Sequence, residues 1–574
     1  MRTMRKTNLG RSLLLVVPLM CSPYVVQKAC ATHAVTMQAQ TSIIKGKVVD
    51  SQSGEPLISA SITVNGTKKM TITNIDGEFS IDAQVGDELV VTSLGYEKKT
   101  VRAAENMTIS LVATSTMLSE TVVVGYSTQK RNSLTGSLKS IDNKELTNVT
   151  TANVTNMLTG KIPGMNVMPG SGKPGSFGAI IVRGKSTING STAPLWVIDG
   201  VIVGKDPGDI NPNDIESLTV LKDAASTAIY GSQGANGVIV VTTKSARAGK
   251  TSITFSAKMG LSTLNNGKVK MMDGAELYDY YKSFTNAAEI AFPRWNEQLR
   301  DSNFDWWKLA THTGNVQNYD LTINSGGDKL SAVFTGGVYK EDGAVRGYDF
   351  TRYNTMMKLN FKPFSWIAIR PSLNGSKGVI DDRQRSTYSM YSMLPWDSPY
   401  DENGKIVGNR SSAWVNSNST NYLYELQYNW SKYDSYSFNG NFDFDIYLTD
   451  WLTFSSVNSY RWSTHLDKSY VDPRTSGAED KGRVSESTST NTRRYTNQLI
   501  KATRSFGDYH GFLMLGYEFN DGEYRYHNGS GTGLVPGFAQ LDITSTPESV
   551  GGNKYEWAVQ SFFANLNADY ANKY

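Results

Sequence analysis

Hydrophobic and polar residues alternate over most of this 574-residue chain, which predicts a protein built mainly from β-strands. The alternation is clearest over 435–448, where Tyr436, Phe438 and Phe442 fall on one face and serine, asparagine and aspartate residues fall on the other. That stretch is longer than the ~5–6 residues usual in soluble strands. It suits a membrane strand of ~9–11 residues that continues into water.

From about residue 252 onward, the pattern predicts ten strands joined alternately by short turns and long loops. This parity is typical of a bacterial outer-membrane β-barrel, with short periplasmic turns and long outer loops. A soluble β-repeat protein with one variable face is the less favoured alternative. The strands are expected near 252–262, 317–325, 330–340, 353–361, 366–374, 435–448, 452–462, 493–504, 511–519 and 557–570.

Two further regions precede these strands. Residues 42–113 contain about seven short apolar runs separated by turn signals such as Asn65-Gly66 and Asp76-Gly77, which predicts a small β-sandwich. From 125 to 247 the pattern is mixed and rich in glycine, which indicates a compact α/β domain. A short helix is expected over 153–158, with Gly160 as its stop signal.

The N-terminus has the pattern of a secretion signal: five basic residues, an apolar stretch and small residues near Ala31 and Ala34. A lipoprotein signal at Cys21 is the less favoured alternative. Without residues 1–34, the remaining chain has 52 basic and 53 acidic residues, so charge does not indicate nucleic acid as a partner.

Composition and motif spacing argue against disulfides, metal sites, hydrolase motifs and a phosphate-binding loop. The only cysteines, Cys21 and Cys30, lie in the expected signal, so no disulfide framework is predicted. The five histidines show no HExxH spacing, and no G-x-S-x-G nucleophile elbow is present. Gly184-Lys185-Ser186 lacks the earlier glycine that a phosphate-binding loop needs. We therefore expect no catalytic residues, no metal and no cofactor.

Several motifs carry a resemblance to a known family. The segment 153–244 contains GKIPGMNV, SGKPGSFGAIIVRGKSTING, PLWVIDGVIV and NPNDIESLTVLKDAASTAIYGSQGANGVIVVTTK, and it resembles the plug domain of SusC/RagA-type TonB-linked outer-membrane proteins. Upstream, GKVVDSQSGEPLISASITVNG resembles the carboxypeptidase-regulatory-like domain that precedes many such plugs. Between the two, LSETVVVGYSTQKR resembles the TonB-box region of the family.

The resemblance implies a mostly β chain with a β-sandwich, an α/β plug and a transmembrane antiparallel β-barrel. A signal peptide precedes the sandwich, and a TonB-box linker joins the sandwich to the plug. Ten strands are too few to enclose a plug of about 120 residues, because plugged lumens appear near ~22 strands. We therefore expect the barrel to be incomplete at the C-terminus. The expected boundaries are 1–34 for the signal peptide, 41–113 for the sandwich, 115–130 for the TonB-box linker, 131–247 for the plug and 250–574 for the first part of the barrel.

The segment expected to couple the protein to TonB is a β-rich run in the linker. A strand there can pair with the periplasmic TonB protein through main-chain hydrogen bonds. An ordinary edge strand of the sandwich is the alternative that the residues alone leave open. The coupling residues are Glu120, Thr121, Val122, Val123 and Val124.

Other residues are expected to act structurally. Three pairs mark turns in the plug where glycine permits a positive φ; a buried Arg183 is expected to pair with an acid such as Asp199, Asp214 or Glu216. Trp396 and Trp414 lie in long loops, where packing is favoured over stacking on substrate. The plug pairs are Arg183-Gly184, Asp199-Gly200 and Tyr230-Gly231.

The resemblance implies an outer-membrane importer of nutrient fragments, either oligosaccharide or peptide, and not an enzyme. Its implied partners are TonB with its inner-membrane motor proteins, a SusD-like surface lipoprotein and outer-membrane lipid. A TonB-linked signal transducer, a surface adhesin and a non-functional truncated product remain the alternatives. The all-β pattern of 42–113 favours transport, because a transducer usually carries an α/β signalling domain at that position.

Overall fold

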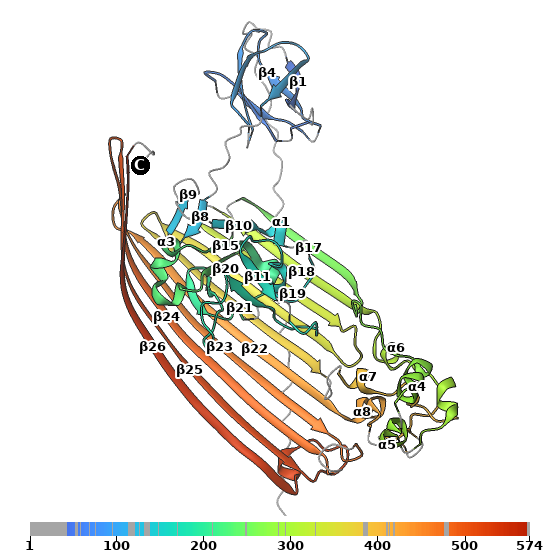
Figure 1. Cartoon of the computed structure of the whole chain (residues 1–574). Helices are drawn as coiled ribbons and strands as arrows, with labels where there is room; N and C mark the ends of the chain where they lie inside the picture. Colours follow the sequence, from blue (N-terminus) through green and yellow to red (C-terminus); the bar gives the residue numbers. More distant parts are fainter. Residues whose placement is uncertain are drawn as a thin grey trace, which may run out of the picture. The chain divides into compact units, whose positions relative to one another are not determined.

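The computed structural model divides the chain into two compact units, residues up to 118 and residues from 119. Figure 1 shows a small β-domain in blue and a broad curved sheet in green to red. The expected signal and Glu120 lie outside the described residues. The structure describes residues 43–51, 56–57, 59–67, 69–74, 76–93, 96–112, 121–124, 127–130, 138–146, 149–168, 170–208, 210–246, 249–284, 286–292, 294–327, 329–382, 388–408, 411, 414–416, 419–475 and 481–570.

The first unit is the predicted seven-stranded sandwich. One sheet has the order β4-β1-β7 and the other β3-β2-β5-β6. Alternate residues point into a core that includes Ile44, Ile62 and Leu89, all fully buried. The strands are β1 (Ile43–Asp50), β2 (Ser61–Val64), β3 (Met70–Ile72), β4 (Glu78–Asp82), β5 (Glu88–Thr92), β6 (Lys99–Arg102) and β7 (Met107–Leu111).

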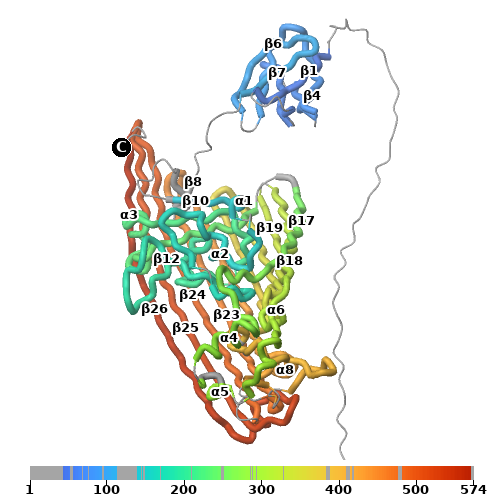
Figure 2. Tube along the Cα trace, turned by 45° about the vertical axis from the view of Figure 1, so that its right-hand side comes forward, coloured from blue at the N-terminus to red at the C-terminus, as the bar shows by residue number. Residues whose placement is uncertain are grey.

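The second unit contains the predicted ten-stranded sheet, here called the strand wall. Its strands pair antiparallel in chain order from β17 to β26, so each hydrogen-bonds to the next. Figure 2 shows the wall curving around the α/β domain. The strands are β17 (Gly249–Ser262), β18 (Gly314–Gly326), β19 (Leu330–Asp342), β20 (Asp349–Phe364), β21 (Ile367–Asp382), β22 (Trp430–Tyr447), β23 (Leu452–Val471), β24 (Arg483–Phe506), β25 (Tyr509–Thr532) and β26 (Thr546–Tyr570).

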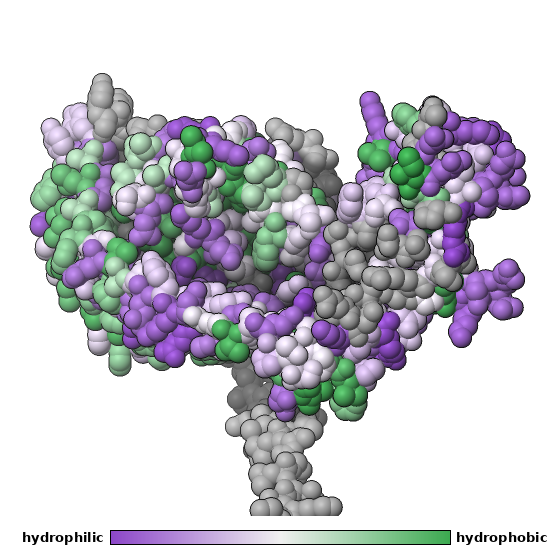
Figure 3. Space-filling model, turned by 60° about the horizontal axis from the view of Figure 1, so that its bottom comes forward, coloured by the Kyte–Doolittle hydropathy of each residue, from purple (hydrophilic) through white to green (hydrophobic). Residues whose placement is uncertain are grey.

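The two faces of the wall differ in polarity. Large apolar side chains such as Phe438, Phe442 and Ile500 are 42–51% exposed on the outer face. The alternate positions are polar, and Ser459 bonds Asn439 on that inner face at 3.1 Å. In Figure 3 hydrophobic residues gather on the left flank, while the loop region on the right is mostly hydrophilic. An apolar outside and a polar inside are what a lipid-facing barrel wall requires.

All ten wall strands lie where the sequence predicted, but most are longer. β24 runs for 24 residues, and the long connection expected over 463–492 shrinks to 472–482. The added residues, such as the polar run 485–492, carry no apolar alternation. Backbone hydrogen bonds between neighbouring strands continue there although the strands have no apolar face. A pattern of hydrophobic residues therefore underestimates the lengths of these strands.

The α/β domain lies on the concave side of the wall. Its main sheet has the order β10-β15-β16-β13-β14, and β11 pairs with β12. The helix predicted over 153–158 is confirmed as α2, and strands lie at 179–182 and 238–243. The elements are β10 (Leu138–Asp142), α1 (Asn143–Leu146), α2 (Val154–Met157), β11 (Met165–Met168), β12 (Ala179–Val182), β13 (Leu195–Ile198), β14 (Val201–Gly204), η2 (Pro212–Asp214), β15 (Ile215–Leu221), α3 (Ala224–Thr227), η3 (Ala228–Gly234) and β16 (Val238–Thr243).

The long connections at one end of the wall carry small helices that sequence reasoning did not predict. Asp273 caps the first of them with a complete capping box to Glu276. No helix among the described residues is both long and apolar enough to cross a membrane. These elements are α4 (Gly274–Lys282), α5 (Ala287–Ala291), η4 (Glu297–Asp301), α6 (Trp306–Ala310), α7 (Tyr388–Ser392), α8 (Tyr422–Tyr428) and η5 (Leu541–Ile543).

Candidate functional site

The interface between the α/β domain and the inner face of the wall is the candidate functional site. The turn between β13 and β14 reaches the wall at Asp199, whose Oδ2 accepts a hydrogen bond from Lys358 Nζ of β20 at 2.7 Å. Both side chains are about four-fifths buried. Asp199 also accepts hydrogen bonds from the backbone nitrogen and the hydroxyl of Thr243 at 2.9 and 2.8 Å. One carboxylate therefore joins two strands of the domain to the wall.

A second contact is made by η2 and the residue that precedes it. Asp320 of β18 accepts hydrogen bonds from the side-chain amides of Asn211 and Asn213 at 3.0 and 2.6 Å. Arg352 of β20 is 2% exposed and donates to the carbonyl of Ala152 and, at 3.3 Å, to Asn211 Oδ1. Its buried charge thus has several acceptors, which offsets the cost of removing it from water.

Asp214 lies in the same region and is almost completely buried, with 3% of its surface exposed. Burial raises the pKa of its carboxyl from 3.8 to about 6, because it outweighs the opposing positive charges of Lys244 and Arg352. The interface therefore contains an acid that changes its charge close to neutral pH.

The opposite side of the domain contacts strands β23 and β24. Arg461 Nη2 donates to the carbonyl of Pro207 at 2.9 Å, and Arg493 donates to the carbonyl of Val203. Tyr495 packs with the apolar core of the domain, and its hydroxyl donates to Glu518 at 2.9 Å. The wall thus binds backbone carbonyls of the segment 203–207 rather than particular side chains.

A loop of the domain extends further along the wall towards the long-loop end. Lys173 Nζ binds Asp382 at the end of β21 at 3.0 Å and lies 4.7 Å from the ring centroid of Tyr348. Gly175, in the same loop, has a positive φ and sits against Phe350, where a Cβ would lie 3.0 Å from the ring. A bulkier residue would move this loop away from the wall.

Most of these contacts are ion pairs and hydrogen bonds, with smaller apolar contacts where Tyr495 meets the plug core and where Ala152 packs with Val316, Tyr339 and Phe350. Net of water, each such bond contributes only about 1 kcal/mol, and a group that loses its partner regains water once the interface opens. The domain is held in one position by many of them, so water can replace much of what holds it when it moves. Such an interface suits a domain that leaves its position on the wall and returns to it.

The turn glycines predicted in the plug behave as expected. Gly184, Gly200 and Gly231 have φ values of 129°, 84° and 57°. Asp199 itself also has a positive φ, of 50°, a conformation that aspartate tolerates better than most residues. Tyr230 is 5% exposed and belongs to the core of the domain.

The prediction for Arg183 was wrong. Its side chain is 55% exposed and pairs with Asp223, the residue preceding α3. The reason is the positive φ of 61° at Arg183, which turns the chain outward at the end of β12. The interior acid Asp199 takes its cation from the wall instead, at Lys358.

The predicted coupling residues Thr121, Val122, Val123 and Val124 form β8 (Thr121–Val124). This strand pairs antiparallel with β9 (Ser127–Lys130) and with neither sheet of the sandwich. It also contacts β15. A strand of the kind proposed for coupling is thus present in the described residues, directly before the α/β domain.

Both loop tryptophans are buried. Trp396 is 8% exposed, and its indole nitrogen donates to the carbonyl of Gly274 at 2.9 Å. Trp414 is 4% exposed, and its indole nitrogen donates to Ser398 O at 2.8 Å. Rings that are covered and already hydrogen-bonded stabilise the packing of the loops. The structure therefore favours the packing role over stacking on substrate.

Sequence reasoning missed the wall residues that hold the α/β domain, among them Lys358, Arg352, Arg461 and Arg493. Their inward direction follows from strand parity, because each lies on the polar face of its strand. Which of those charges meets the domain depends on strand stagger, which the sequence does not show. Within the described residues, no group of three or more histidine, cysteine or acidic side chains is placed to hold a metal ion.

Comparisons with known proteins agree with this arrangement. Residues 44–124 match the CarboxypepD_reg-like domain, and residues 130–238 match the TonB-dependent Receptor Plug Domain. TonB-dependent receptor SusC of Bacteroides thetaiotaomicron is 35% identical over 330 residues, 56% of this chain and 32% of that protein. A TonB-dependent receptor of Formosa agariphila is 30% identical over 563 residues, 93% of this chain and 55% of that protein.

Among solved structures, the RagAB peptide importer in its open-open state superposes with a TM-score of 0.70 at 23% identity. The match covers 79% of this chain and 55% of that chain, and it establishes the fold. A wall of antiparallel strands that holds a plug on its inner face defines a plugged outer-membrane receptor. The chain belongs to the SusC/RagA-type TonB-dependent receptors. It spans about half the length of the Formosa relative and about a third of SusC.

Proposed function

We propose that this protein acts in an active importer of the outer membrane that moves oligosaccharide or peptide fragments into the periplasm. The observation that carries the proposal is the polar interface between plug and wall, centred on Asp199 and Lys358. The plug closes the inner side of the wall, yet most of its contacts are ones that water can replace. Transport then requires work to displace the plug and no change to any bond in the substrate.

Force from TonB enters through the segment before the plug. In this proposal, an extended segment of TonB pairs with the strand β8, and main-chain hydrogen bonds transmit the pull. The next strand of the plug, β10, is an edge strand of its five-stranded sheet and pairs only with β15 among the described strands. Leu138, the first residue of β10, pairs with Leu221 of β15. A pull from the linker therefore acts first on the hydrogen bonds at this end of the two strands. Peeling an edge strand breaks its bonds one after another.

The proposed partners follow from the family. TonB and its inner-membrane motor proteins supply the work, and a SusD-like surface lipoprotein presents substrate at the long-loop end. One structural neighbour is a peptide importer, which supports uptake as the activity. The seven-stranded sandwich also supports import over signalling, because it is all-β rather than an α/β signalling domain.

The test removes the coupling strand while keeping the length of the linker. Residues 120–124 are replaced by five glycine and serine residues in the full protein, and labelled nutrient uptake and surface binding are measured in cells. We expect normal assembly and surface binding, with uptake reduced to the level of a strain that lacks TonB. Continued uptake by this variant at the normal rate would show that the coupling strand is elsewhere.

A further inference from the structure

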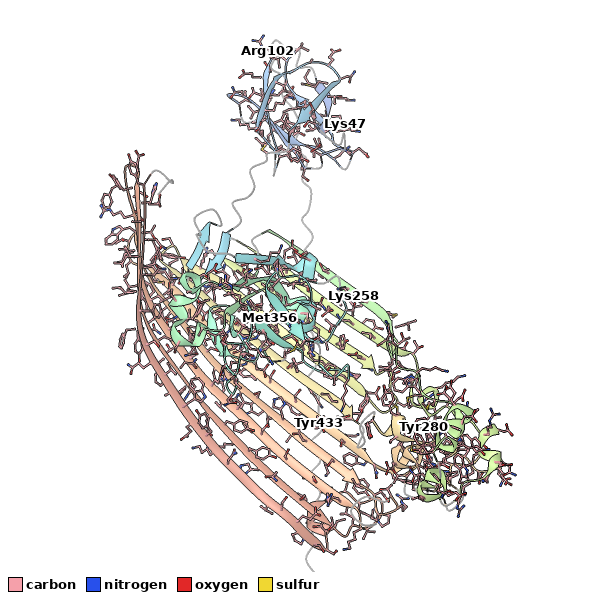
Figure 4. The ribbon with its side chains drawn as sticks, viewed as in Figure 1. Lys47, Arg102, Lys258, Tyr280, Met356 and Tyr433 are labelled. Carbon is pink, nitrogen blue, oxygen red and sulfur yellow. The ribbon has the colours of Figure 1, made fainter. Side chains whose placement is uncertain are left out.

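The inner face of the wall carries a cavity of about 320 Å³ on the long-loop side of the plug. Along β24 it begins about 20 Å from the plug contact at Arg493, since Ser487 is six residues away at ~3.3 Å each. Figure 4 labels Tyr433 in this part of β22, away from the plug. Its lining includes Tyr433, Asp467, Ser487, Tyr526, Asn528 and Ser530.

Most polar groups in this lining are hydroxyls. Ser487 donates to Asp467 Oδ2 at 3.1 Å, and Ser530 and Ser549 share a hydrogen bond of 2.8 Å. Hydroxyls both donate and accept, and a carboxylate with one bond filled still has acceptor sites left. A ligand with many neighbouring hydroxyl groups can therefore pair repeatedly along this surface.

The charges of the lining do not suit an anionic ligand. Lys468 is the one cation among the described lining residues, but it alternates with Asp467 onto the outer face of β23 and binds Glu486 there at 2.6 Å. On its inner side the cavity therefore carries the negative charge of Asp467. It provides no cation for a peptide carboxylate or an acidic side chain, which most peptide mixtures contain.

Aromatic rings continue from the cavity towards the plug. Tyr524 and Tyr555 lie opposite each other on β25 and β26, on the same face as Tyr526, and are 37% and 63% exposed. Two residues further along β26, Trp557 lies 5.5 Å from the guanidinium of Arg493, which holds the plug at Val203. Exposed rings with a polar edge offer flat apolar surface beside hydrogen-bonding groups.

From these observations we infer that the cavity and the Tyr524–Tyr555 pair form a binding site for a neutral oligosaccharide. Sugar hydroxyls would bond Asp467, Asn528 and the serines, and the C–H faces of the rings would rest on the tyrosines. This inference rests on the proposed import function and deepens it, because it selects glycan over peptide as the substrate class. The row of rings would lead the chain of sugars from the cavity to the plug.

Binding to the purified full chain in detergent tests the inference without TonB. The probes are four neutral hexasaccharides, the β-1,4-glucan, α-1,4-glucan, β-1,4-mannan and β-1,4-xylan, and a tryptic digest of casein, each followed by calorimetry. We expect at least one hexasaccharide to bind and the digest not to bind. Asp467→Ala and Tyr524→Ala should each weaken hexasaccharide binding at least tenfold.

The matched control is Tyr460→Ala, because Tyr460 is 47% exposed on the outer face of β23. It should bind hexasaccharide like the unchanged protein. The inference is overturned if no hexasaccharide binds, if the digest binds in their place, or if Tyr460→Ala weakens binding as much as Tyr524→Ala does. Continued uptake by the linker variant, with oligosaccharide binding intact, would count against the import proposal alone, so the two failures are distinguishable.

Discussion

Asp199, at the tip of the plug hairpin, is bound by Lys358 of the strand wall at 2.7 Å, and both side chains are about four-fifths buried. The two residues are 159 positions apart in the chain. In the proposed import mechanism, this contact must break when the plug leaves the wall. It is therefore the contact whose removal reports most directly on how the plug is held.

Lys358→Met should loosen the plug, because Asp199 would stay buried without its cation. Breaking one side of a buried pair costs about 3 kcal/mol. Since the chain beyond the expected signal contains no cysteine, an Ala152→Cys reporter, which the wall residues Val316, Tyr339 and Phe350 cover, labels with maleimide when the plug leaves the wall. We expect labelling to accelerate by about 100-fold, which corresponds to the same free energy. In the double variant with Asp199→Asn, much of this acceleration should disappear. Equal labelling rates in all variants would show that the Asp199–Lys358 pair does not hold the plug.

Asp214→Asn should stabilise the plug at neutral pH. The folded pKa of Asp214 is about 6 and its ordinary value is 3.8, so the folded plug binds the proton more tightly. The stabilisation from that proton is complete below pH 3.8 and is lost as the pH rises through about 6. The difference amounts to about 3 kcal/mol at most. Hydrogen exchange in β15, corrected for intrinsic rates, should slow as the pH falls from 7 to 5 in the unchanged protein and stay flat in the variant.

Gly204→Ala should release the end of β14 from the wall. Gly204 has a φ of 97°, and an added Cβ would lie 2.5 Å from Arg493 Nη1. Gly200→Ala is the matched control, because Gly200 also has a positive φ but no atom within 4 Å of the new Cβ. Both variants carry backbone strain of roughly 1 kcal/mol, and only the first also displaces Arg493. Faster exchange in β14 for Gly204→Ala than for Gly200→Ala is expected, and identical exchange would argue against the wall contact.

Proline at either Val122 or Val123 should separate the backbone role of β8 from its side-chain role. Neighbouring residues of a strand direct their N–H groups to opposite edges, so one of the two prolines removes a donor from the edge away from β9. We expect one proline variant, or both, to lose TonB-dependent uptake while surface binding persists. Val122→Thr and Val123→Thr keep the backbone donors and should transport normally. If the threonine variants fail equally, coupling depends on the valine side chains instead.

The sequence alone determined the β-sandwich, the plug segment and the ten strands of the wall. The alternation of residues such as Phe438 and Asn439 is local, and it fixes which face of a strand meets lipid and which meets water. The turn glycines of the plug were equally visible, because the need for a positive φ is a property of one residue and its neighbours. The lengths of strands such as β24 were underestimated, since their outer ends have no apolar face to read.

Only the tertiary structure decided which inner residues hold the plug. Lys358 meets Asp199, and Arg183 turns outward to Asp223, because strand stagger and a left-handed turn set those distances. The same holds for the cavity, where Tyr433, Asp467 and Tyr526 come from three strands. Pairings between residues far apart in the chain depend on how the sheet curves and how the plug is seated. Neither of these leaves a periodic signal in the sequence.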